Sequence, residues 1–331
     1  MSGQYRGSQA FNSFNPLLQE SVNPNTGSLF LSLPIIKLSG KRSSIDLSVN
    51  LFYSAGLRGT FGLPKGWAFD LPYVLHGKSV TVNGRTFAID KDWTDSEGHS
   101  SGLRYNNNHS IQFKRVDPVD LISGRPGQYG YIFSHADGSV DYFDVFGKPL
   151  EHHDIYGNYL YYTYVSGETE GVDSPAAKLQ SITDSWGQEV TFAHDDGLQT
   201  VSLPDNTEIV IQFNTSNVYA LKTPSGLTEF EYVGFDNSRA VVHKITYPSG
   251  LVSLYEHGAI EYINTKGESG QMPAVASSRS MDSDNKVYRH MKYFYGRETD
   301  GATYTGAKLG CQIGGLRDNL MDDDDRAHDY V

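Results

Sequence analysis

The chain of 331 residues has a single cysteine, Cys311. One cysteine excludes an intrachain disulfide and any zinc site built from several thiolates. This fits a protein made in the reducing cytosol, and it leaves later export open. No apolar run approaches the roughly 20 residues that a membrane-spanning helix needs. The opening sequence MSGQYRGSQAFNSFNPLLQ also lacks the basic and apolar regions of a secretory signal peptide. We therefore expect no membrane span and synthesis in the cytoplasm without a classical signal peptide.

Positive charge and helical periodicity are scarce as well. Lys and Arg number 27 against 39 Asp and Glu, which gives a formal net charge of −12 and a pI of about 5.3. Such an acidic chain is a poor match for the phosphate backbone of a nucleic acid or for an anionic membrane surface. No segment keeps apolar residues at i, i+3 and i+4 for long, so we expect little helix.

Glycine and aromatic residues are abundant instead, with 34 Gly, 22 Tyr and 16 Phe. The stretch 135–165 shows how they are arranged. Gly138, Gly147 and Gly157 stand nine and then ten residues apart, and tyrosine-rich segments lie between them. Glycine supplies the positive φ of a tight turn, and aromatic or β-branched residues suit a pleated strand. The stretch therefore predicts strand–turn–strand units that repeat.

The repeat continues towards the C-terminus. Turns are predicted at Gly187, Gly226 and Gly250, and the last two belong to matching Pro-Ser-Gly-Leu sequences 24 residues apart. This repeated sequence indicates an internal repeat of about two strands per unit. Each hairpin alone would expose an apolar face and two edges, so stacked neighbours are needed to bury them. We predict an all-β protein of repeated antiparallel hairpins that form a curved sheet or partial shell.

The N-terminal half shows strand patterns of a different kind. Segment 45–53 alternates Ile, Leu and Val with Asp, Ser and Asn, which is the period of a strand with one buried face. Asn83-Gly84 between two short β runs predicts a hairpin. We divide the chain into four predicted regions: a flexible lead at 1–20, an opening β segment at 21–134, degenerate hairpin repeats at 135–295, and a Gly-rich, acidic tail at 296–331 that is disordered or continues into a longer protein.

Polar groupings offer no recognisable catalytic motif, so we expect neither an enzyme nor a bound metal or cofactor. His152 and His153 with Asp154 could ligate a metal, but neighbouring residues of a strand point to opposite faces, which favours a polar patch before a turn. The segment 282–285 resembles the start of a calcium loop, yet the Gly at position six and the Glu at position twelve of such a loop are missing.

Paired carboxylates are a further candidate for chemistry. Asp141 with Glu151, or Glu229 with Glu231, could serve a glycan hydrolase if their side chains stood roughly 5–9 Å apart across a cleft. The sequence does not set that separation.

Tryptophans are the candidates for ligand binding. Trp67, Trp93 and Trp186 could stack on a sugar or a peptide if they are exposed. In a β protein such rings more often pack in the core or across strands. These three residues are the predicted binding set.

The order of these features resembles the RHS/YD-repeat family. An opening segment at 23–74 contains an element, 62–67, that is similar to a Gly-x-Gly-Trp motif of such proteins. Glycine turns followed by tyrosine-rich strands then recur, at 137–142, 156–164, 185–192 and 226–232. The resemblance covers a little over half of the chain.

Members of that family include bacterial polymorphic RHS toxins, the B and C components of insecticidal Tc toxins, and animal teneurins. Their long β-sheets wind into a hollow shell, which in the toxins encloses a polypeptide cargo and in teneurins serves adhesion. This chain is far shorter than such a shell. It also lacks a DPxG autocleavage element, because Asp117-Pro118 is followed by Val119. The resemblance therefore implies the first portion of a shell, a partial shell or a small stand-alone relative.

For function, the resemblance implies a non-catalytic encapsulating module of a toxin or effector system, exported as part of that assembly. Its partner would be another polypeptide, either the shell remainder or a cargo. The alternative is an adhesion or carbohydrate-binding module that uses exposed aromatic side chains. A glycan hydrolase has the least support.

Overall fold

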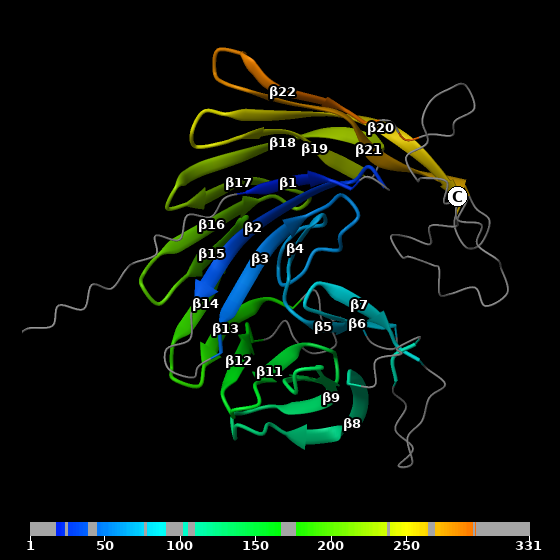
Figure 1. Ribbon diagram of the computed structural model, residues 1–331. Helices are drawn as coiled ribbons and strands as arrows, with labels where there is room; N and C mark the ends of the chain where they lie inside the picture. The colour runs from blue at the N-terminus through cyan, green and yellow to red at the C-terminus, as the bar shows by residue number, and fades with distance from the viewer. Residues whose placement is uncertain are drawn as a thin grey trace, which may run out of the picture.

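The computed structural model describes residues 18–23, 26–38, 45–75, 78–90, 102–104, 110–166, 177–236, 239–263, 269–293 and 295. Within these residues the chain forms 22 β-strands and no helix, arranged in three antiparallel sheets (Figure 1). The predicted all-β fold of antiparallel hairpins is confirmed. Most of the predicted lead, the whole predicted tail, Trp93 and Cys311 lie outside the described residues. No helix among the residues described could cross a membrane.

Two small sheets come from the N-terminal part. The first joins β1 (Gln19–Val22), β2 (Leu29–Leu38), β3 (Leu47–Tyr53) and β4 (Trp67–Phe69) in sequence order. In β3 buried and less buried residues alternate, as the apolar–polar pattern of the sequence predicts. The second sheet joins β5 (Tyr73–Leu75), β6 (Ser79–Val82) and β7 (Arg85–Ala88). Its predicted hairpin is confirmed, with φ of 49° at Asn83 and 70° at Gly84.

A fifteen-stranded sheet occupies the rest of the described chain, and each strand pairs with its neighbours in sequence. Its strands are β8 (Gln112–Asp120), β9 (Gln128–Ser134), β10 (Val140–Phe143), β11 (Pro149–His153), β12 (Tyr159–Tyr164), β13 (Leu179–Asp184), β14 (Glu189–Asp195), β15 (Leu198–Ser202), β16 (Glu208–Phe213), β17 (Val218–Thr223), β18 (Gly226–Asp236), β19 (Arg239–Thr246), β20 (Val252–Ile263), β21 (Ser269–Met281) and β22 (Val287–Lys292). The sheet runs across the region boundary predicted at residue 134, and that division stays a prediction.

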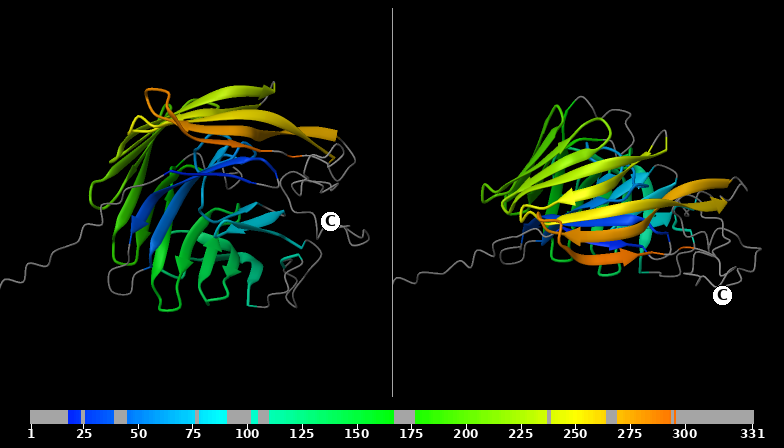
Figure 2. Two further views of the ribbon diagram at one scale, coloured as in Figure 1. Left: turned by 45° about the horizontal axis from the view of Figure 1, so that its top comes forward. Right: turned by 90° about the horizontal axis from the view of Figure 1, so that it is seen from above.

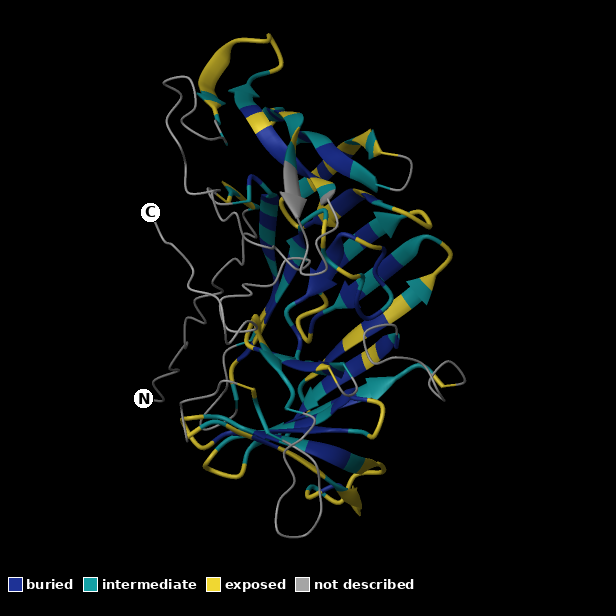
Figure 3. Cartoon of the chain, turned by 90° about the vertical axis from the view of Figure 1, so that its right-hand side faces the viewer, coloured by how far each residue is buried: buried dark blue, intermediate teal, exposed yellow. Residues whose placement is uncertain are grey.

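The large sheet curves around the four-stranded sheet, which lies against its concave face (Figures 1 and 2). Register shifts interrupt several strand pairs, for example between Tyr142 and Phe143 in the pair β10–β11. Bulges of this kind bend a strand and increase its twist. Buried residues therefore follow the inner side of the curved sheet and the strands that it faces (Figure 3).

Trp67 lies at the centre of the core between these two sheets. Its ring meets Phe230 edge-on at a centroid distance of 5.0 Å, and its Nε1 donates a hydrogen bond of 2.9 Å to the hydroxyl of Tyr232. Tyr53 on β3 completes the link, because its hydroxyl accepts a bond of 3.0 Å from the backbone N–H of Val242 on β19. A second, smaller core joins β5–β7 to β8–β10 and includes Val74, Val80, Phe113 and Phe133.

Three of the hairpin turns share an aspartate three residues before the glycine, which the sequence analysis did not include. In the turn 154–158, Oδ1 of Asp154 accepts hydrogen bonds of 2.8 Å from the backbone N–H groups of Tyr156 and Asn158. Gly157 in the same turn has a φ of 85°. The turns 144–148 and 184–188 repeat this arrangement. The motif is therefore Asp-x-aromatic-Gly. The glycines predicted at turns all have positive φ: Gly138 88°, Gly147 91°, Gly157 85°, Gly187 82°, Gly226 122° and Gly250 80°.

Candidate functional site

Two histidine–carboxylate groups lie on opposite faces of the hairpin β10–β11. Asp141 is opposite His152 in the strand register, and Tyr142 is opposite Glu151. Because successive side chains of a strand point to opposite faces, Asp141 and His152 share one face, while Glu151 and His153 share the other. The prediction that His152 and His153 point apart is confirmed by their different partners.

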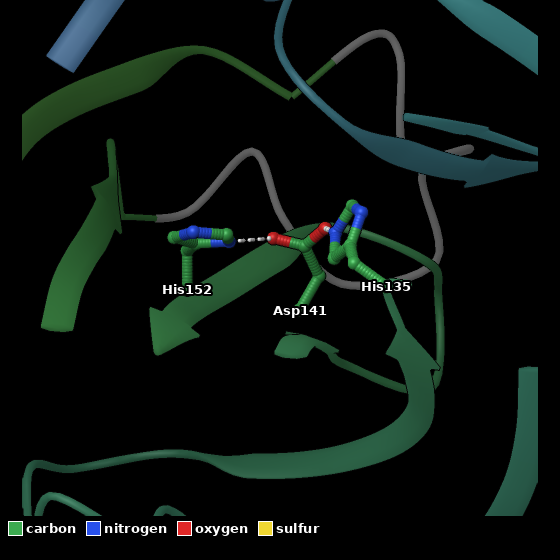
Figure 4. A group of neighbouring side chains, drawn as sticks. All are labelled: His135, Asp141 and His152. Carbon is green, nitrogen blue, oxygen red and sulfur yellow. Dashed lines mark hydrogen bonds and ion pairs between the residues drawn. The ribbon is translucent and has the colours of Figure 1, made fainter. Parts of the chain in front are cut away.

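The first group gathers Asp141 from β10, His152 from β11, and His135 from the turn after β9 (Figure 4). The carboxylate of Asp141 lies between the two imidazoles. Its Oδ2 is 2.6 Å from Nε2 of His135, and its Oδ1 is 2.7 Å from Nδ1 of His152. Asp141 is only 3 % exposed. His135 follows β9 directly and is held by the turn 135–139, in which its backbone N–H donates a bond of 2.9 Å to Ser139.

The electrostatics of this group favour a charged carboxylate. Burial raises the pKa of Asp141, but hydrogen bonds with His135 and His152 outweigh that effect, so the pKa lies below its ordinary value. Burial lowers the pKa of His152, and its hydrogen bond with Asp141 together with nearby negative charges outweighs this, so the pKa is raised. The arrangement can hold a proton between an imidazole and a carboxylate, or present two nitrogens and a carboxylate to a cation.

The second group surrounds Glu151 on the other face. Glu151 is fully buried, and its carboxylate accepts a hydrogen bond from the hydroxyl of Ser123. Its other oxygen is 2.8 Å from Nε2 of His153. The ring of His153 stacks on Tyr159 with an interplanar angle of 26° and meets Tyr142 edge-on. This group is a buried polar pair inside an aromatic layer.

The carboxylate pairs predicted for glycan hydrolysis can now be placed. Asp141 and Glu151 lie on opposite faces of one strand pair, so they do not converge on a common substrate. Glu229 and Glu231 both lie exposed on β18, and Glu231 pairs with Nζ of Lys244 at 2.7 Å.

The tryptophans predicted as a binding set do not form one surface. Trp67 is fully buried, so its ring cannot stack on a ligand from solvent; the expectation for this residue is wrong because β4 lies between two sheets. Trp186 is 66 % exposed in the turn between β13 and β14. Tyr156, which the sequence analysis did not single out, is 80 % exposed in the turn between β11 and β12. Trp93 lies outside the described residues.

Comparison with known proteins gives a distant structural likeness only. No family model matches the chain, and no curated protein matches it. The TcdB2–TccC3 crystal structure is similar at a TM-score of 0.37 and 11 % identity, covering 82 % of this chain and 16 % of that one. The Photorhabdus luminescens Tc holotoxin pore is similar at a TM-score of 0.21 and 10 % identity, covering 83 % and 15 %. The chain thus spans about a sixth of the length of either protein, and scores this low assign no function.

Proposed function

We propose that this chain is a non-catalytic structural module of an RHS-type toxin or effector assembly, and that it binds another polypeptide along the outer edge of β22. The proposal rests on the sequence resemblance and on one structural observation. Among the described residues β22 pairs only with β21, so it ends the fifteen-stranded sheet with an unpaired edge. An exposed edge of this kind offers backbone hydrogen bonds to an additional strand.

The opposite end of the sheet is protected against such pairing. There β8 carries Pro118, which has no backbone N–H, and its register with β9 shifts between Arg115 and Val119. Proline, bulges and charged side chains are the devices by which edge strands avoid pairing with other chains. β22 has no proline, and its exposed residues include Tyr288, which is 61 % exposed. β22 also carries charged side chains, and its register with β21 shifts between Ser280 and Met281. Proline therefore distinguishes the two edges, and β22 is the edge that we assign to a partner.

The backbone of β22 shows which of its groups point away from β21. Beyond the last residue of β22, the N–H of Tyr293 donates a hydrogen bond of 2.9 Å to the carbonyl of Ala276 in β21. Backbone groups of alternate residues in an antiparallel strand point to opposite sides. His290 and Lys292 therefore direct their N–H and C=O groups away from β21. Because β22 contains Arg and Lys but no acidic residue, a partner strand with acidic side chains fits best.

His290→Pro tests this assignment, because it removes an outward N–H while the bonds between β22 and β21 are kept. His290→Ala is the matched control, since it changes the same side chain and keeps the N–H. We would measure mass by light scattering at several concentrations, for the chain alone and with the polypeptides encoded beside its gene. We expect His290→Pro to abolish the association and His290→Ala to retain it. A monomer that ignores its neighbours, or equal association of both variants, would refute the proposal.

A glycan-binding role has narrower support. It rests on Tyr156 and Trp186, which are exposed in the turns β11–β12 and β13–β14, at the same ends of their antiparallel strands. Their rings belong to the Asp-x-aromatic-Gly turns, in which a solvent-facing aromatic residue is already part of the repeated motif.

A further inference from the structure

We propose that His135, Asp141 and His152 form a binding site for one divalent transition-metal ion of the zinc type. One ligand atom from each residue can be chosen so that the three atoms all lie within 4.8 Å of one another. Figure 4 shows the carboxylate between the two imidazole rings, with each ring facing a different carboxylate oxygen. This site is independent of the β22 edge described above.

The donor set selects the class of ion. Two imidazole nitrogens and one carboxylate suit Zn²⁺, Co²⁺, Ni²⁺ or Fe²⁺, whereas Ca²⁺ and Mg²⁺ prefer oxygen ligands throughout. Three protein ligands leave a fourth position of a tetrahedral ion for water or another group. The three proposed ligands coordinate through nitrogen and oxygen only.

Small movements of the side chains would convert the hydrogen-bonded group into a coordinated one. An ion about 2.1 Å from each donor atom separates those atoms by about 3.4 Å in tetrahedral geometry. The two nitrogen–oxygen separations, to different oxygens of Asp141, are now 2.6 and 2.7 Å, so each opens by less than an ångström when both oxygens face the ion. The ligand atoms of the two imidazoles lie within 4.8 Å of each other and have to reach the same separation of about 3.4 Å. Rotation of the two imidazoles about their side-chain bonds supplies that change without moving the strands.

The scaffold also meets the requirements of a site. Asp141 and His152 are cross-strand partners, and His135 immediately follows β9, which pairs with β10. The sheet therefore fixes all three backbone positions before any ion arrives. The side chain of Asp141 is 4 % exposed, whereas those of His135 and His152 are 11 % and 23 % exposed. An ion can therefore reach the imidazoles, and the buried carboxylate between them balances its charge.

The strand alternation supplies a matched control. His153 is next to His152 in sequence, also contacts a buried carboxylate, and lies on the opposite face. The chain would be treated with a chelator, dialysed and titrated with Zn²⁺ by calorimetry and with Co²⁺ by visible absorption. We expect one equivalent to bind, with Co²⁺ bands that lack the near-ultraviolet thiolate charge-transfer band of a cysteine ligand. His152→Gln and His135→Gln should each weaken binding at least about tenfold, because even residues behind the ligands cost 10–100-fold elsewhere. His153→Gln should leave the affinity unchanged.

Several outcomes would overturn the site. They are the absence of Zn²⁺ binding at micromolar concentrations, a thiolate band from Cys311, or equal effects of His152→Gln and His153→Gln. Far-ultraviolet circular dichroism of the metal-free variants separates lost binding from lost folding. If one histidine variant fails to fold, the other still decides the question, since each removes a single ligand. If a folded His135→Gln or His152→Gln variant still binds Zn²⁺ with unchanged affinity, the three side chains are a hydrogen-bonded group of the fold and not a metal site.

Discussion

Gly147 is the residue through which a repeat turn contacts the small sheet β5–β7, and its replacement by alanine gives a sharp test of the packing. Its φ is +91°, and an added Cβ would lie 2.1 Å from the carbonyl oxygen of Val74 and 2.9 Å from the Cβ of Val74. The carbonyl of Gly147 also accepts a hydrogen bond of 2.9 Å from the N–H of Val74. The substitution therefore combines two costs, a strained backbone and a collision with β5.

Other turns of the same motif separate these two costs. Gly187 has a φ of +82° and Gly157 of +85°, and an added Cβ at either meets nothing within 4 Å. Alanine at these two positions should lower the free energy of unfolding only through the left-handed backbone, by about 1–2 kcal/mol. At Gly147 the collision adds about 1–3 kcal/mol, the usual cost of overpacking. We therefore expect a total loss of about 2–5 kcal/mol for Gly147→Ala.

Urea unfolding followed by far-ultraviolet circular dichroism would measure the three variants. The midpoint urea concentration should fall slightly and equally for Gly157→Ala and Gly187→Ala, and further for Gly147→Ala, with unchanged slopes. Equal midpoints for all three variants would show that the turn does not press against β5. A lower midpoint for Gly157→Ala and Gly187→Ala, with no change for Gly147→Ala, would refute the packing argument.

Two further predictions concern the core and its tyrosines. Trp67→Ala should lower the free energy of unfolding by about 3–5 kcal/mol in urea titrations, whereas Tyr232→Phe, which removes the hydroxyl that accepts a bond from Trp67 and donates one to the carbonyl of Val218, should cost about 1–3 kcal/mol; a larger loss for Tyr232→Phe than for Trp67→Ala would contradict the central place of the indole. At alkaline pH, burial raises the pKa of Tyr53 to about 12, against the opposing hydrogen bond from Val242, and its unfolded value is about 10. The folded state therefore binds more protons above pH 10, and stability present below that pH is lost as the pH rises through the folded pKa. Burial raises the pKa of other core tyrosines as well: Tyr162, Tyr164, Tyr232 and Tyr255. Absorbance at 295 nm should show these tyrosines ionising only as the far-ultraviolet circular dichroism of the β-sheets is lost. Ionisation of all 22 tyrosines near pH 10 in an intact fold would contradict this expectation.

Local signals account for most of the fold that the sequence predicts. The Asn83-Gly84 hairpin and the strand pattern at 45–53 depend on residues close together in the chain, and both are confirmed. In the large sheet every strand pairs with its sequence neighbours, so finding the turns is nearly enough to order the strands. The packing of β1–β4 into the concave face has no such local signal, because it depends on contacts such as Trp67 with Tyr232, which are 165 residues apart.

Burial explains the error at Trp67. A tryptophan beside Gly and Pro in a short segment has the composition of an exposed loop as much as that of a core strand. What decides its environment is that the concave sheet supplies Phe230 and Tyr232 as partners. Trp186 differs because its turn supports it by backbone hydrogen bonds to Asp184, so the ring needs no packing partner and remains exposed.

The histidine cluster shows why a site can be missed although its residues are conspicuous. His152 and His153 attract attention as neighbours in sequence, but on a strand neighbours point apart. The residues that join His152 are its cross-strand partner Asp141 and His135, which lies just beyond the end of β9 and is 17 positions earlier in the chain. The signal that would have found them is the pair of glycine turns at Gly138 and Gly147, because two hairpins fix which residues of three strands lie side by side. Once the turns are placed, counting outward from each brings the three side chains to one face, and the adjacent His153 to the other.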